Sequence, residues 1–186
     1  MTNSMSREKL IEATRDLLWE KGLASISPRN ILDRAGVGQG SMYHYFKTKR
    51  DLVIEAINRN ADELLTNASV IFGSGDTAYR KIEAFLDCGV SAQMGCKLGN
   101  LAADHEVMSD VEMVDIINRM FNSLAKMLEG VLAVGIAAGQ LPRTLKPLDG
   151  AWMVIAMLQG GLVCAKVGQS RQPYESAIKS FLCLLR

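Results

Sequence analysis

The sequence predicts an all-α protein of nine helices. Apolar residues recur at three- and four-residue spacing along almost all of the 186 residues, which is the period of a helix that buries one face. No clear run alternates between apolar and polar residues, as a half-buried strand would require. The four prolines all fall near the start or just after the end of a periodic segment, where proline is compatible with helices.

The first three predicted helices are close together in the sequence. The first spans about residues 6–21. Ser27 is a suitable N-cap for the second, and Pro28 occupies its first position, where the missing N–H costs nothing. Gly36 ends that helix, and a third short helix is predicted over residues 38–45.

The remaining helices are longer, apart from one short segment. Thr48-x-x-Asp51 is close to a capping box, and Ser109-x-x-Glu112 is a capping box; both are typical of helix starts. The six helices are predicted over residues 48–72, 77–93, 97–105, 109–139, 147–168 and 173 to the C-terminus.

Charge is distributed unevenly along the chain. The first fifty residues hold nine basic and five acidic side chains, a net of +4, whereas the rest holds twelve basic and fifteen acidic ones. A basic segment beside a mildly acidic one suggests a surface that meets a polyanion. An ordinary solvated surface would also fit this balance.

The second and third helices, joined by a glycine turn, have the spacing of a helix-turn-helix, whose second helix enters the major groove of DNA. The residues between and beside them supply an amide, hydroxyls, an imidazole and ammonium groups for base edges and phosphates. In an alternative interpretation, the aromatic cluster only packs a small helical domain. The candidate DNA-binding residues are Ser27, Arg29, Gln39, Gly40, Ser41, Tyr43, His44, Tyr45, Lys47 and Lys49.

Residues 6–57 resemble the DNA-binding domain of the TetR (TetR/AcrR-type) family of bacterial regulators. The matching stretch is ILDRAGVGQGSMYHYF, residues 31–46, followed by a K-x-K sequence. The resemblance implies that Tyr43 and Lys49 contact phosphates, and it leaves open whether His44 or Tyr45 reaches DNA. It also implies a homodimer formed by the last two helices of each subunit.

The eighth predicted helix supports a dimer independently, because apolar side chains such as Trp152, Leu158 and Val163 cover nearly all its sides. Such a helix must be buried, either against a partner or in its own subunit's core. We therefore expect a helix-turn-helix domain over residues 1–50, the helix at about 48–72 as connector, and a ligand-binding and dimerisation domain over residues 51–186.

Residues 95–104 resemble a GC-x-x-GNLA-x-E segment of family members that sense electrophiles or aromatic, flavonoid-like compounds, with Asp104 in place of the glutamate. A helix start and Lys97 beside Cys96 would favour its thiolate, so Cys96 is either a reactive thiol or a small buried apolar residue. The second domain is rich in methionine, which suits an adaptable pocket for an apolar or aromatic effector. The candidate ligand-binding residues are Cys96, Asn100, His105, Met120, Trp152 and Gln159.

Other classes of protein fit the sequence less well. Gly36-Val-Gly-Gln-Gly40 is no nucleotide loop, because no strand precedes it and no Gly-Lys-Ser/Thr follows. The sequence shows neither a catalytic set nor zinc spacing around its four cysteines, so we expect no enzyme, metal or cofactor. The uncharged run from residue 150 to 165 is too short to span a membrane, and no signal peptide is evident. We expect a cytoplasmic protein with free thiols.

The sequence thus predicts a ligand-responsive transcriptional regulator, a repressor that a small molecule releases from a double-stranded DNA operator. One alternative is a redox or electrophile sensor that acts through Cys96. Another is an architectural protein that binds DNA without sequence preference.

Overall fold

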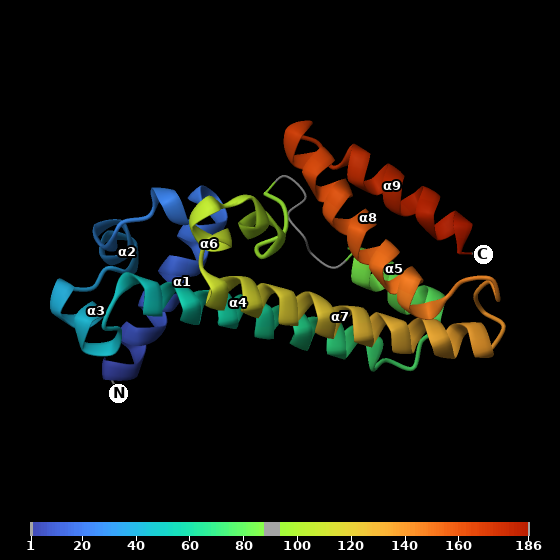
Figure 1. Ribbon diagram of the computed structural model, residues 1–186, viewed down its shortest axis with the longest axis horizontal. Helices are drawn as coiled ribbons and strands as arrows, with labels where there is room; N and C mark the ends of the chain where they lie inside the picture. Colours follow the sequence, from blue (N-terminus) through green and yellow to red (C-terminus); the bar gives the residue numbers. More distant parts are fainter. Residues whose placement is uncertain (1, 88–93, 186) are drawn as a thin grey trace. The chain divides into compact units, whose positions relative to one another are not determined.

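The computed structural model describes residues 2–87 and 94–185. Over these residues the chain forms nine α-helices, two 3-10 helices and no strand, which confirms the all-α prediction. Contacts divide the chain into two units, Met1–Asp62 with Lys97–Asn118, and Glu63–Cys96 with Arg119–Arg186. The helices of the first unit are α1 (Thr2–Lys21), η1 (Leu23–Ser25), α2 (Pro28–Ala35), α3 (Gln39–Tyr45), the start of α4 (Lys49–Phe72), η2 (Gly99–Ala103), α6 (His105–Met108) and the start of α7 (Val111–Ala137) (Figure 1).

The core of the first unit joins α1 to α2 and α3. Burial of each large aliphatic or aromatic side chain contributes about 1.5–3 kcal/mol, so this small core fixes how α2 and α3 are held. Its fully or almost fully buried residues include Leu10, Ile11, Leu17, Leu18, Ile31, Met42 and Phe46.

Local signals set the ends of α2 as predicted. The Ser27 hydroxyl accepts a hydrogen bond from the Asn30 backbone N–H at 3.2 Å, and the Asn30 side chain accepts one from the Ser27 N–H at 3.0 Å. This capping box and Pro28 begin the helix. Gly36 ends it in the left-handed conformation, with φ of 62°, which glycine adopts without steric cost.

The start of α7 differs from the prediction. The Ser109 hydroxyl donates to the carbonyl of His105 at 2.7 Å instead of capping α7. Asp110 is the cap, since its Oδ1 accepts from the backbone N–H groups of Glu112 and Met113 at 3.1 and 3.2 Å. The capping box assigned to Ser109 was wrong by one residue, because the ionised carboxylate of Asp110 is the stronger acceptor.

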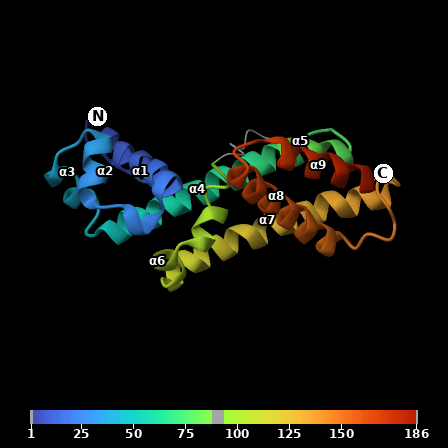
Figure 2. The same ribbon diagram turned by 90° about the horizontal axis from the view of Figure 1, so that it is seen from above.

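The second unit contains α5 (Ala78–Asp87), α8 (Pro147–Val167), α9 (Gln172–Leu184) and the remaining parts of α4 and α7. Helices α8 and α9 lie side by side (Figure 1, Figure 2). Tyr174 of α9 is buried against α8, and a Cβ built on Gly161 would lie 2.9 Å from the Tyr174 ring. The Tyr174 hydroxyl donates to the carbonyl of Leu86. The rest of the helix predicted to residue 93, with Cys88, lies outside the described residues.

Helix α8 is not buried on all sides within its own chain. Trp152 and Met153 are about two-fifths exposed, and Val163 and Val167 are 60% and 82% exposed. Helices α7 and α8 are long and apolar enough to cross a membrane by length and composition, but the core helices of soluble proteins share these features.

Candidate nucleic-acid interface

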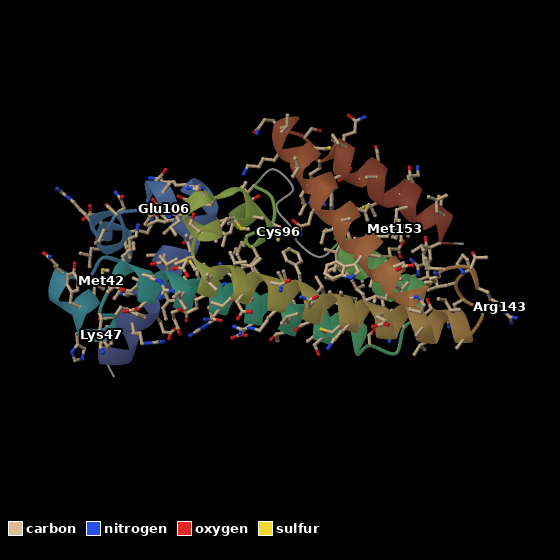
Figure 3. The ribbon with its side chains drawn as sticks, in the orientation of Figure 1. Met42, Lys47, Cys96, Glu106, Arg143 and Met153 are labelled. Carbon is tan, nitrogen blue, oxygen red and sulfur yellow. The ribbon has the colours of Figure 1, made fainter. Side chains whose placement is uncertain are left out.

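Helix α3 has one buried face and one polar, exposed face. Met42 is fully buried, and Phe46, directly after the helix, is 6% exposed. Gln39, Tyr43 and His44 are exposed. Figure 3 shows Met42 within the first unit and Lys47 on its surface. The amide, phenol and imidazole of α3 are therefore presented to the solvent together.

Gly40 lies on this exposed face, and its own fold does not require a glycine there. A Cβ built on Gly40 would meet nothing within 4 Å, and its backbone conformation is helical. Ser41, His44, Tyr45 and Ser6 of α1 line a shallow hollow beside it. A glycine in open space on a polar helix face would allow a groove wall or a base edge to approach the backbone.

The structure separates the two aromatic candidates that follow Tyr43. Their rings meet edge to face, with centroids 4.8 Å apart. His44 is exposed, whereas Tyr45 is half-buried. His44 is thus the more accessible of the two, and Tyr45 supports its ring.

The two lysines after α3 differ in their contacts. Lys47 is exposed, and its ammonium forms no ion pair or hydrogen bond within residues 2–87 and 94–185. The half-buried Lys49 donates from Nζ to the carbonyl of Ile26 at 2.9 Å, just before α2. Lys49 therefore helps to position the start of α2, whereas Lys47 is available to a phosphate.

At the start of α2, Ser27 is occupied by its capping box, with its Oγ also donating to Asn30 Oδ1 at 2.8 Å. Arg29 is 90% exposed, with its guanidinium 3.8 Å from Asp33. An ion pair so exposed is weak, so Arg29 could exchange it for a phosphate.

The six candidate ligand residues are distributed over both units. Asn100 is half-buried and His105 is exposed, both in the first unit. In the second unit, Cys96 and Met120 are buried, at 8% and 2% exposure. Trp152 and Gln159 lie on α8, the former two-fifths exposed. Reaction at Cys96 remains a prediction, which loss of electrophile response in Cys96→Ser would test.

Sequence reasoning missed the residues that attach segment 97–118 to the helix-turn-helix. Asp104 Oδ1 caps α6 by accepting from the N–H groups of Glu106 and Val107 at 3.0 and 3.3 Å. Its Oδ2 accepts from the Leu23 N–H at 2.6 Å, and a Cβ on Gly22 would lie 2.8 Å from the same oxygen. One carboxylate thus joins α6 to the end of α1.

Two further contacts reinforce this attachment. The Arg50 guanidinium donates to both oxygens of Asp110, at 2.5 and 2.9 Å, and to Glu112 at 2.8 Å. Hydrogen bonding to Arg50 lowers the pKa of Asp110, and the two carboxylates raise the pKa of Arg50. The Lys97 ammonium lies 5.2 Å from the centre of the Trp19 ring, a cation–π distance.

Comparison with known proteins supports the same fold. Residues 10–56 match the family described as bacterial regulatory proteins, tetR family, and residues 80–181 match the tetracyclin repressor-like C-terminal domain. An uncharacterized HTH-type transcriptional regulator from Lactococcus lactis is 28% identical over 180 residues, covering 92% of this chain and 88% of that protein. The repressor NemR of Escherichia coli K12 is 25% identical over 185 residues, covering 95% and 92%.

Solved structures share the fold across the whole chain. A TetR-family regulator from Agrobacterium tumefaciens superposes with a TM-score of 0.89 at 20% identity and covers 98% of each chain. Reduced NemR from E. coli has a TM-score of 0.85 at 23% identity and covers 94% of each. The C-terminal family match alone spans more than half of the sequence. The chain therefore belongs to the TetR family of bacterial regulatory proteins and is a DNA-binding transcriptional regulator that responds to ligands.

Proposed function

We propose that this regulator is a homodimeric, cytoplasmic repressor that binds a double-stranded operator and releases it when a small apolar or aromatic effector binds. The observation that carries the proposal is the division of α3 into a buried face, Met42, and an exposed face with Gln39, Tyr43 and His44. The names of several relatives support repression, since NemR, DhaR and KstR2 are each called an HTH-type transcriptional repressor.

Each exposed group at α3 has a chemical role in this proposal. The amide of Gln39 reads a base edge, for which its paired donor and acceptor are suited. Tyr43, His44 and Lys47 donate to phosphates, and Gly40 and Ser41 allow close approach. Ser27, Arg29 and Lys49 act at the start of α2, where backbone N–H groups and the helix dipole favour phosphate. Tyr45 acts through the His44 ring.

Dimerisation accounts for the uncovered apolar face of α8. The exposed Trp152, Met153, Val163 and Val167 form a stripe that no part of the described chain covers. Ala156 and Gly160 are also exposed on α8, and a Cβ on Gly160 would meet nothing within 4 Å. Apolar stripes of this kind mark protein interfaces, and small residues allow a partner helix to come close.

Segment 97–118 gives the repressor a route for its signal. Its contacts with Leu23, Trp19 and Arg50 attach it to α1 and α4 of the helix-turn-helix unit. An effector that binds residues 51–186 and favours a different position of this segment would move the reading helices away from the operator spacing. Coupling of 1–3 kcal/mol is typical for such a change. We assign DNA recognition to residues 1–50, and the helix at about 48–72 connects this domain to the ligand-binding and dimerisation domain.

Selection from random DNA duplexes tests the proposal. We expect enrichment of a palindrome whose half-sites lie about one helical turn apart or somewhat more. Binding that depends steeply on salt but enriches no sequence would instead indicate an architectural protein and contradict the repressor.

A further inference from the structure

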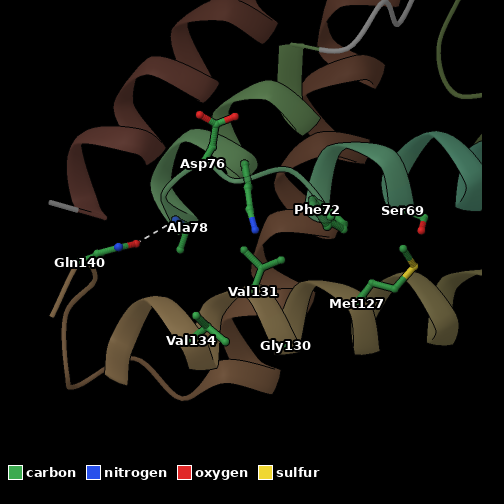
Figure 4. Close-up of a pocket in the computed structure, with 11 residues that line it drawn as sticks. Ser69, Phe72, Asp76, Ala78, Met127, Gly130, Val131, Val134 and Gln140 are labelled. Carbon is green, nitrogen blue, oxygen red and sulfur yellow. Dashed lines mark hydrogen bonds between the residues drawn. The ribbon is translucent and has the colours of Figure 1, made fainter. Parts of the chain in front are cut away.

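The second unit contains a groove that the sequence analysis did not suggest. Its walls are the end of α4, the loop and first turn of α5, and the second half of α7, with Gln140 at one end (Figure 4). Its volume is about 500 Å³, within the range of about 300–1,000 Å³ typical of small-molecule sites. None of the six candidates is among its lining residues.

The wall of the groove is largely apolar. Phe72 closes one side, and Met127 and Val131 extend from α7 toward α4 (Figure 4). Val134 also lines the groove and is 69% exposed. Gly130 lies among them, and a Cβ there would meet nothing within 4 Å, so the space over α7 is left open by the absence of a side chain.

One cation lines this apolar wall. Lys81 is half-buried, and its ammonium has no ion-pair or hydrogen-bond partner within the described parts of the chain. The carboxylate of Asp76, also in the wall, is exposed and accepts from the Ser74 hydroxyl at 3.1 Å rather than pairing with Lys81. A partly desolvated cation is stabilised by an anion.

A second donor is available in the same groove. Gln140 Oε1 accepts from the Ala78 N–H at 2.9 Å (Figure 4). This bond uses the acceptor of the Gln140 amide and leaves its NH2 group as a donor. An ammonium and an amide NH2 beside a hydrocarbon wall are complementary to a carboxylate that carries an apolar body.

We propose that this groove binds an amphipathic organic anion, a carboxylate whose hydrocarbon body packs on Phe72, Met127 and Val131. The ammonium of Lys81 neutralises the carboxylate, and Gly130 provides the space for the hydrocarbon. This site goes beyond the DNA-binding proposal, because it requires nothing of α3 or of operator release.

Octanoate and its neutral counterpart 1-octanol are suitable probes, measured by calorimetry and by the NMR shift of the Met127 methyl group. Octanoate should bind and shift this signal. Lys81→Gln should weaken octanoate binding about three- to fivefold, the upper part of the range for a partly exposed charge pair, and leave octanol unchanged. In Lys146→Gln, which alters an exposed lysine outside the groove, octanoate affinity should stay within about twofold of the wild type.

Gly130→Leu provides a variant that keeps the fold. Its Cβ enters open space, and leucine favours the helix over glycine, so the variant should fold while its side chain fills the groove and abolishes binding of both probes. Equal octanoate affinity in the wild type and Lys81→Gln, or in the wild type and Gly130→Leu, would overturn the proposal. A change of oligomeric state in Gly130→Leu would overturn it too, since the groove would then be covered by a second copy. Neither readout uses DNA, so failure here leaves the repressor proposal intact.

Discussion

The reading segment, residues 27–49, and the attached segment, residues 97–118, belong to one unit but obtain their roles in opposite ways. In the reading segment, neighbours in the sequence make the site, and its polar groups are exposed on α3. In the attached segment, single side chains gain their roles from partners far away, such as Leu23, 81 residues before Asp104. The first region can therefore lose its function without losing stability, whereas the second should lose both.

The largest expected effect is on DNA affinity. Replacing Tyr43 with Phe and Lys47 with Ala removes two phosphate donors, each worth about 1–3 kcal/mol, so operator affinity should fall at least tenfold. Fluorescence anisotropy over a salt series should show that the slope of log affinity against log salt concentration falls in magnitude by about one, the contribution of one lysine–phosphate contact. Because both side chains are exposed, the melting temperature should not change. A large drop in the melting temperature would show that these exposed side chains of the reading segment also stabilise the fold.

Asp104→Ala, in the attached segment, should lower stability as well as function. It removes the α6 cap and the acceptor of the Leu23 N–H, so unfolding free energy should fall by about 1–3 kcal/mol. Urea denaturation measures this change. Glu106→Ala is the matched control, because that exposed carboxylate forms no hydrogen bond or ion pair among the described residues. Equal stability of the two variants would show that Asp104 is not an anchor.

Gln39→Ala separates base recognition from phosphate contact within the reading segment. Loss of the Gln39 amide should weaken the preference for the correct base at one operator position by about 1–2 kcal/mol, while non-specific DNA binding stays the same. Competition between the selected operator and single-base variants measures this preference. A uniform loss across all sequences would place Gln39 on the phosphate backbone instead.

The same contrast explains how much the sequence could predict. The two ends of α2 followed from the N-cap Ser27, Pro28 and Gly36, which act over a few residues. Asp104 looked only like a departure from a glutamate pattern, because its main partner, the Leu23 N–H, is a backbone group that carries no sequence signal. The groove at Lys81 was missed for a related reason: α4, α5 and α7 together enclose it.

The smallest expected effect concerns pH. Hydrogen bonding to Arg50 holds the pKa of Asp110 below its usual 3.8, so this contact adds stability above that pH and loses it as the pH falls through the lowered pKa. Arg50→Gln should be less stable than the wild type by a constant amount from pH 8 to pH 5, and the difference should narrow below about pH 3.8. Urea denaturation at each pH measures it. In Arg143→Gln, whose exposed guanidinium has no ion pair among the described residues, no such narrowing is expected. If the gap for Arg50→Gln stays constant into acid, the stability that Arg50 provides does not come from its hydrogen bonds to ionised Asp110.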